Sequence, residues 1–147
     1  MKVYVAASAG GDSYPRVMAA IATLRAHGFE VTCTWPETVA KVGSANPRDA
    51  SDIDRRGWST QDLLEIDEAD ALLFLVPTLP ATTRGAWFEA GYAYSEKKHL
   101  LFSGDTKQSV FCALGHEHAT DQQAINHLRI LREPELGLVR LRDAEVG

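Results

Sequence analysis

The feature that most constrains the fold is an uninterrupted apolar run, residues 71–76 (ALLFLV), in the middle of the chain. A strand that is hydrophobic at every position has both faces buried, which is typical of the central strand of a parallel sheet covered by helices. The run is also too short for an ordinary buried helix. The sequence therefore predicts an α/β domain built around this strand.

The segments before this run alternate between strand and helix patterns. Residues 3–7 and 30–35 are apolar or β-branched, as in buried strands. Between them, residues 14–27 carry apolar side chains at helical spacing, and Gly28 provides a stop signal. A strand, a helix and a second strand in this order predict a parallel crossover.

The second half of the chain continues the alternation. We predict helices over residues 60–68 and 84–98, and a strand over residues 100–103. Residues 109–114 are the candidate fifth strand, and Thr120 is expected to cap a further helix. The last residues are expected to add a short strand or an exposed tail.

This order of elements predicts one domain over residues 1–147, a doubly wound, mainly parallel flavodoxin-like sheet with helices on both faces. Such sheets bind ligands beyond the carboxyl ends of their strands. The segments expected there are residues 7–12, 35–57, 77–83 and 103–109. Residues 36–57 are polar and form a long loop, with room for a short helix, and loops of that length are usually functional.

Charge and cysteine usage exclude several classes of function. A formal net charge of −5 argues against a broad surface that binds nucleic acid polymers. We find no signal peptide and no apolar segment of membrane-spanning length, so we expect no membrane partner. Cys33 and Cys112 lie far apart in apolar runs, which indicates buried thiols and a cytoplasmic location.

Residues 84–93 (RGAWFEAGYA) carry the strongest chemical signal. Glu89 falls in the first turns of the predicted helix, where the helix dipole favours the ionised carboxylate that a nucleophile requires. Glycines at 85 and 91 allow another group to approach the backbone closely. The alternative is that Glu89 only complements the helix dipole, but the capping box is absent because its hydroxyl position is Ala86.

A second acidic segment, residues 62–70, precedes the central strand. Its apolar side chains are expected to face the core, which leaves the acids on other faces. We assign Glu65, Asp67 and Glu68 to a solvated face. Asp62 and Asp70 differ because each borders an apolar run, and they are candidates for function.

Taken together, these two segments resemble the nucleoside 2-deoxyribosyltransferase family and its hydrolytic relatives, the nucleoside 5'-monophosphate N-glycosidases. The matching residues extend from the first strand to Phe102 and comprise Asp62, Ala69, Asp70, residues 71–76, Gly85, Glu89, Gly91 and Ala93. The resemblance implies that Glu89 attacks the anomeric carbon of a nucleoside or nucleotide and that Asp62 assists at the leaving base. It also implies a homo-oligomer with no cofactor.

One departure from the family pattern concerns the substrate. Transferases carry an Asp six positions before the Glu, and this chain has Thr83 there. The monophosphate hydrolases have a hydroxyl residue in that region that helps to bind phosphate, so the departure favours a hydrolase or a phosphorylated substrate. Thr82 or Thr83 is otherwise a helix cap.

The expected phosphate contacts come from two turns. Ser8, Gly10 and Gly11 loosely resemble the family's glycine-rich phosphate loop, and Gly85 opens the second turn. Backbone amides at such turns bind anions. Arg16 and Arg84 are the candidate cations, so we expect a nucleoside monophosphate to bind better than the nucleoside.

Three tryptophans and two histidines complete the candidates. Trp35, Trp58 and Trp87 either stack on a nucleobase or belong to the core. We expect Trp35 at the end of a strand and Trp58 in the long loop, both on the ligand side. His116 and His118 lack a third ligand at a recognised spacing, so we expect no metal site.

Fold alone does not decide function, because doubly wound sheets host many activities. Two alternatives therefore stay open beside an N-glycosidase or transferase. One is a nucleotide-binding or sensing module without catalysis. The other is an NAD-cleaving domain, which shares the fold class and also uses a Glu.

Overall fold

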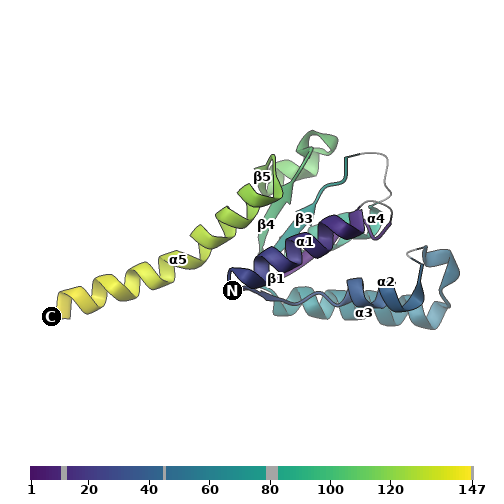
Figure 1. Ribbon diagram of the computed structural model, residues 1–147, viewed down its shortest axis with the longest axis horizontal. Coiled ribbons are helices and arrows are strands. Elements are labelled where there is room, and N and C mark those ends of the chain that lie inside the picture. Colours follow the sequence, from purple (N-terminus) through teal and green to yellow (C-terminus); the bar gives the residue numbers. More distant parts are fainter. Residues whose placement is uncertain (11–12, 45, 79–82, 147) are drawn as a thin grey trace.

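A parallel five-stranded sheet forms the centre of the computed structural model (Figure 1). The structure describes residues 1–10, 13–44, 46–78 and 83–146, and from residue 134 on it describes the backbone alone. The strand order is β2-β1-β3-β4-β5 and every pairing is parallel, which confirms the predicted doubly wound, flavodoxin-like sheet. The strands are β1 (Lys2–Ala7), β2 (Glu30–Val31), β3 (Ala71–Leu75), β4 (His99–Ser103) and β5 (His116–His118).

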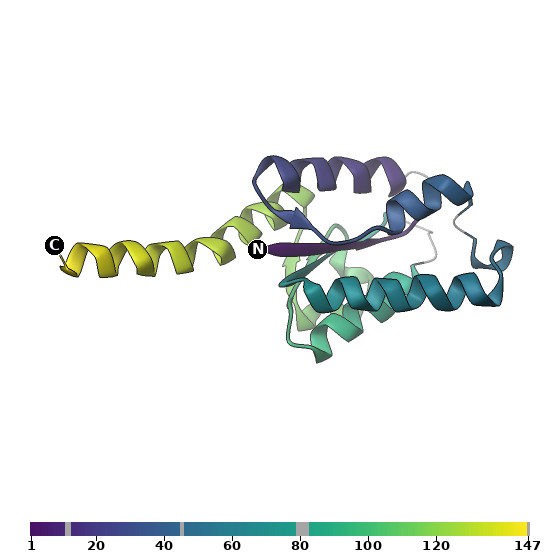
Figure 2. The same ribbon diagram turned by 90° about the horizontal axis from the view of Figure 1, so that it is seen from below.

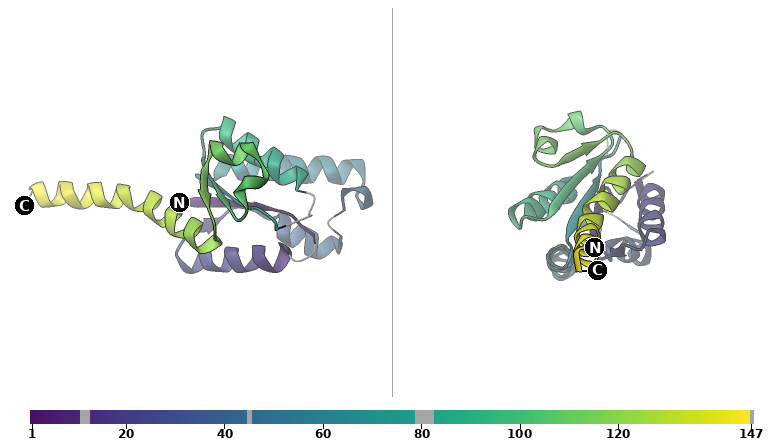
Figure 3. Two further views of the ribbon diagram at one scale, coloured as in Figure 1. Left: turned by 90° about the horizontal axis from the view of Figure 1, so that it is seen from above. Right: turned by 90° about the vertical axis from the view of Figure 1, so that its left-hand side faces the viewer.

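Helices cover both faces of the sheet. Figure 2 shows α1 and α3 on opposite sides of β1, and Figure 3 shows α5 on the α1 side and α4 on the α3 side. The α-helices are α1 (Ser13–Ala26), α2 (Trp35–Val42), α3 (Asp52–Glu68), α4 (Arg84–Ser95) and α5 (Asp121–Val146). Three short 3₁₀ helices, η1 (Pro47–Asp49), η2 (Thr106–Gln108) and η3 (Val110–Leu114), lie in the connections.

The core lies on both sides of β3, in which every residue is buried. On the α4 side, Phe74 packs against Trp87 and Phe102 with ring centroids 4.5 and 5.7 Å apart. On the other side, α1 and α5 add their own buried apolar stripes, Val17, Ala20, Ile21, Leu24, Ala124, Ile125 and Leu128. The apolar run that opened the sequence argument is therefore the central strand of the sheet.

The structure corrects the predicted boundaries in the first half of the chain. The strand β2 ends at Val31, and Trp35 begins helix α2 instead of ending a strand. Pro36 favours this start, because the backbone N–H groups of the first helical turn have no partner within the helix. A proline there, which has no N–H, therefore costs no helical hydrogen bond. Helix α3 begins at Asp52, where the Ser51 hydroxyl accepts the N–H of Asp54. Trp58 therefore lies on a helix and not in a loop.

The second half shows two further corrections. Residues 109–114 do not form the fifth strand, because the Ser109 hydroxyl accepts the N–H of Phe111 and starts η3. The fifth strand is β5 instead. The last residues do not form the short strand that was one expectation, since α5 continues to Val146 (Figure 1). Within the described residues, we find no helix long and apolar enough to cross a membrane.

Candidate active site

A cavity of about 540 Å³ opens beyond the carboxyl ends of β1 and β3. Its wall contains residues that follow β1, residues of α2 and α3, and the first turns of α4. In this order β2 is added on one side of β1 and the later strands on the other, so the switch point lies between β1 and β3. Doubly wound sheets bind ligands at this point. The volume lies in the range of sites for small organic molecules.

Glu89 lies in the second turn of α4 and lines this cavity. The fully buried Tyr4 reaches it from β1, and the Tyr4 hydroxyl donates a hydrogen bond to Glu89 Oε2. Tyr4 points toward α4 because it alternates in β1 with residues that face the α1 side. The central part of the sheet therefore holds the Glu89 carboxyl in place.

Asp62 lines the same cavity from the middle of α3. The Tyr4 hydroxyl also acts to lower the pKa of Asp62. One phenol therefore influences two carboxyl groups that are distant in sequence. Because the three groups interact, their protons titrate as a coupled set.

Burial controls the charge state of both carboxyl groups. It raises the pKa of Glu89 to about 8, against the opposing effect of the Tyr4 hydrogen bond. It also raises the pKa of Asp62 to about 7, with a further increase from the charge of Glu65. Burial thus opposes the ionised form of Glu89 that the helix dipole was expected to favour.

Several predicted substrate contacts lie in the cavity wall, and others do not. Ser8, Thr83, Arg84 and Gly85 line the cavity. Gly10 is exposed and lies outside the wall, while Gly11 and Thr82 fall outside the described residues. Thr83 holds the N-cap position of α4, but within the described part of the chain its side chain makes no capping hydrogen bond. Its hydroxyl thus remains available to a ligand.

The three tryptophans divide between the cavity and the core. Trp35 and Trp58 both line the cavity, one from α2 and the other from α3. The indole Nε1 of Trp35 donates to the Val5 carbonyl oxygen at 2.9 Å, which anchors its ring to β1. Trp87 belongs to the aromatic core with Phe74 and Phe102.

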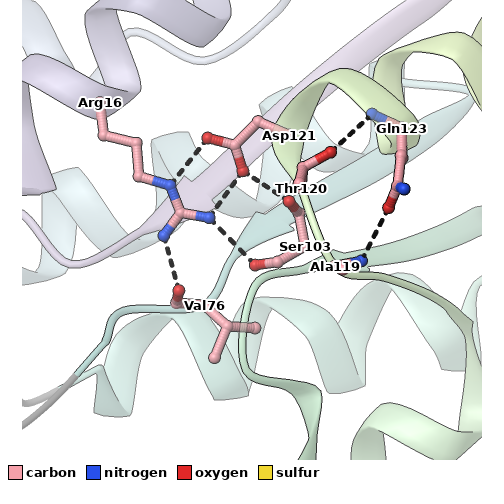
Figure 4. A network of polar contacts seen from close by, with 7 residues as sticks. All are labelled: Arg16, Val76, Ser103, Ala119, Thr120, Asp121 and Gln123. Carbon is pink, nitrogen blue, oxygen red and sulfur yellow. Dashed lines mark hydrogen bonds and ion pairs between the residues drawn. The ribbon is translucent and has the colours of Figure 1, made fainter.

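Arg16, one of the two candidate phosphate cations, already has protein partners (Figure 4). Its guanidinium bonds both carboxylate oxygens of Asp121, at 2.8 and 2.6 Å, and the carbonyl oxygens of Val76 and Ser103. The assignment of Arg16 to phosphate is therefore wrong. Sequence reasoning missed Arg48, which lines the cavity from η1 beyond α2.

The acidic segment, residues 62–70, is only partly exposed to solvent, in contrast to the prediction. Asp67 and Glu68 are exposed as expected, but Glu65 is buried and accepts hydrogen bonds from Thr34. Asp70 is exposed just before β3 and accepts the Lys2 N–H at 2.8 Å. It therefore lies at the amino end of the sheet, away from the cavity.

Tyr4 is the functional candidate that the sequence analysis missed. A signal existed, because Tyr4 is the single side chain with a polar group in the otherwise aliphatic run of residues 3–7. Buried tyrosine hydroxyls usually have a hydrogen-bond partner. The sequence gave no means of identifying that partner, since Glu89 is 85 positions away.

The histidine pair gains a neighbour that its spacing did not indicate. His118 Nε2 lies 2.9 Å from His127 Nδ1, and the His116 ring packs against the His127 ring. Burial and then the neighbouring imidazoles lower the pKa values of His118 and His127. In residues 1–10, 13–44, 46–78 and 83–146, no three histidine, cysteine or acidic side chains are placed to hold a metal ion.

The fold and the cavity define a flavodoxin-like protein with a cavity at the switch point of its sheet. No protein-family model and no curated protein sequence matches the chain. Among solved structures, the chain is similar to a CMP N-glycosidase from Clostridium botulinum, with a TM-score of 0.54 and 17% sequence identity. The alignment covers 89% of this chain and 99% of the other. At that identity the likeness establishes a shared fold.

Proposed function

We propose that this protein is an N-glycosidase that cleaves the bond between the base and the sugar of a nucleoside 5'-monophosphate. The observation that carries the proposal is the group of Glu89, Asp62 and Tyr4, in which two half-buried carboxyl groups line one cavity and a buried phenol bonds the first of them. The fold shared with a CMP N-glycosidase supports it.

The cavity suits a nucleotide in shape and chemistry. Trp35 and Trp58 offer flat apolar surfaces on which a nucleobase stacks. The carboxyl groups of Glu89 and Asp62 provide the acid and the nucleophile that glycoside cleavage requires. A volume of about 540 Å³ accommodates a mononucleotide rather than a nucleic acid polymer.

The first step is a displacement at the anomeric carbon. The Glu89 carboxylate forms a bond to C1', and the electrons of the N-glycosidic bond move to the base, which takes a proton from Asp62. The Tyr4 hydrogen bond favours the ionised form of Glu89, because it is donated to the carboxylate. Between the two raised pKa values the pair holds about one proton, and the reactive form carries it on Asp62.

The second step returns the enzyme to its starting state. Asp62, now ionised, takes a proton from a water molecule, whose oxygen attacks C1' and releases the sugar from Glu89. The products are the free base and the sugar 5-phosphate. Thr83 at the position of the transferases' second Asp favours water, rather than a second base, as the acceptor.

The phosphate is proposed to lie at the first turn of α4. Arg84 and Gly85 line the cavity there, and the first amides of a helix attract anions. Arg48, which also lines the cavity, supplies a second guanidinium, and the Thr83 hydroxyl adds a donor. These groups replace the role first expected of Arg16.

Activity is tested by incubating the protein with nucleosides, their 5'-monophosphates and NAD, and by quantifying the free base chromatographically. We expect release from a monophosphate, and a decrease of about 10³-fold or more in Glu89→Gln, which cannot form the ester. Glu96→Gln, at the exposed end of the same helix, is the control. Release from NAD alone would instead establish the NAD-cleaving alternative, and binding without release would establish the sensing module.

Phosphate recognition is tested by calorimetry with a deoxynucleoside and its 5'-phosphate. In Arg84→Ala, we expect the Kd of the phosphate to rise roughly 10-fold, the value of one charge-assisted hydrogen bond, while the Kd of the nucleoside stays the same. Equal binding of the two ligands to the wild-type protein would exclude a phosphate subsite and favour the nucleoside transferase.

A further inference from the structure

We propose that Glu65 is a positioning residue of this site, which fixes the wall that carries Trp35 and places a buried carboxylate beside Asp62. This inference rests on the proposed function for its catalytic meaning. Its geometry, in contrast, is independent of any reaction, because each contact lies within the protein.

The Glu65 carboxylate joins two elements of the cavity wall. It is 3% exposed, and its Oε1 accepts the N–H and the hydroxyl of Thr34 at 2.8 and 2.9 Å. Oε2 also accepts the Thr34 hydroxyl at 2.9 Å and lies 3.5 Å from the Gln61 amide nitrogen. Thr34 and Gln61 both line the cavity, so one buried side chain holds a residue on each side.

The bond between Glu65 and Thr34 matters for ligand binding because Thr34 precedes Trp35. It is the N-cap residue of α2, but its own side chain caps nothing in the described structure. Glu65 instead fixes the start of the helix, and Trp35 follows immediately. The Trp35 ring is therefore anchored at two points, through the backbone at Thr34 and through Nε1 at Val5.

The charge of Glu65 has a second consequence. Glu65 follows Asp62 by three positions on α3, so the two side chains are neighbours on the helix surface. After burial, the charge of Glu65 is the next cause of the raised pKa of Asp62, and it contributes to the raised pKa of Glu89. It thereby helps to keep on Asp62 the proton that the leaving base needs.

Other titratable and charged groups also lie around Asp62. Tyr4 from β1 lowers the pKa of Asp62, and Glu89 faces it from α4. Arg48 and Arg84 line the same cavity as cations, and the buried Cys33 after β2 has a pKa raised to about 12. An amide at position 65 would make a similar set of contacts with less desolvation, so the carboxylate is needed for its charge.

The test measures the titration of Asp62 directly, by carboxyl ¹³C NMR of the ligand-free protein. In Glu65→Gln we expect the Asp62 midpoint to move to lower pH by roughly half a unit or more, because a neighbouring negative charge is removed. Glu65→Asp keeps the charge and should leave the midpoint near its wild-type value. An unchanged midpoint in Glu65→Gln, or equal shifts in both variants, would overturn the electrostatic role.

Two further variants separate the charge from the contact. Thr34→Val removes the hydroxyl bonds and keeps the charge, so we expect KM to rise roughly 3- to 10-fold with the Asp62 midpoint unchanged. An unchanged KM would overturn the positioning role. Glu68→Gln, exposed on the same helix, is the matched control and should change neither quantity. Because the NMR readout needs no turnover, a shifted midpoint in an inactive protein would reject the N-glycosidase and retain the role of Glu65.

Discussion

At the scale of single residues, Tyr4 determines how the two carboxyl groups share protons. Its hydroxyl lowers the pKa of both Glu89 and Asp62, against burial. In Tyr4→Phe we therefore expect both limbs of the pH–activity profile to move to higher pH, and kcat at pH 7 to fall about 10- to 100-fold. Glu65→Gln should move both limbs the opposite way.

The profile is measured as kcat/KM against pH, with base release as the readout. Tyr92→Phe is the control, because the Tyr92 hydroxyl bonds Asp67 at 2.6 Å on the exposed surface of the protein. The same shift in both variants would show that the effect is general and that Tyr4 does not act through the carboxyl groups.

The sequence made Glu89 and Asp62 candidates because each lies next to apolar residues, and the structure places both in the cavity wall. Glu65 was wrongly assigned to the solvated face because helical periodicity predicts that charged side chains face solvent. The prediction fails for an acid whose oxygens accept hydrogen bonds within the protein, as those of Glu65 do. Its partner Thr34 lies 31 positions away, so nothing local indicated the contact.

At the scale of helices and strands, Arg16 connects α1 with β3, β4 and α5. From α1 it bonds the carbonyl oxygens at the ends of β3 and β4 and the carboxylate of Asp121 at the start of α5. We expect Arg16→Met to lower the free energy of unfolding by about 2–4 kcal/mol, because it leaves the carboxylate of Asp121 partly buried without its cation.

Urea denaturation monitored by circular dichroism measures this change. Arg25→Met, an exposed position on the same helix, is the control and should change the free energy of unfolding by less than about 0.5 kcal/mol. A similarly small effect of Arg16→Met would show that the ion pair does not hold the elements together.

The boundaries of helices and strands were predicted well where a periodic pattern is long. The predictions were wrong where a capping side chain determines the start of a helix. The central strand and the first helix match their patterns closely. In contrast, α3 begins at the Ser51 cap and η3 begins at the Ser109 cap, and each serine hydroxyl changes the assignment of a whole segment. A single serine in a segment without clear periodicity does not show whether it caps a helix or lies in a loop.

At the scale of the whole molecule, the half-buried Glu89 and Asp62 affect how stability depends on pH. Glu89 and Asp62 have folded-state pKa values of about 8 and about 7, above their values in an unfolded chain. The folded state therefore binds more protons. The stability that these two groups contribute is complete below about pH 4 and is lost as the pH rises through 7 and 8.

Asp121 acts in the opposite direction. Burial would raise its pKa, but the hydrogen bonds from Arg16 and Ser103 hold it below the usual range, so its contribution disappears as the pH falls below about 4. Stability should therefore be greatest at mildly acidic pH. Between pH 5 and 8.5 we expect Tm to fall, and Glu89→Gln should reduce that fall by roughly 3–8 °C. A Tm that rises over this range would contradict the assignment.

The overall architecture was the most predictable feature, because alternating strands and helices admit few topologies. The cavity was located in outline by the same reasoning, since a doubly wound sheet has its switch point at β1 and β3. Its detailed wall was not predictable, because Arg48 and Thr34 reach it from segments whose side chains have no periodic signature.

Tyr4 belongs to β1, which pairs with strands on both sides and is among the last segments to open when a protein fluctuates. Thr83 and Arg84 stand at the exposed end of a helix, where openings are more frequent. On warming, the contacts that Thr83 and Arg84 offer to a ligand should therefore loosen while Tyr4 still keeps its place in the sheet.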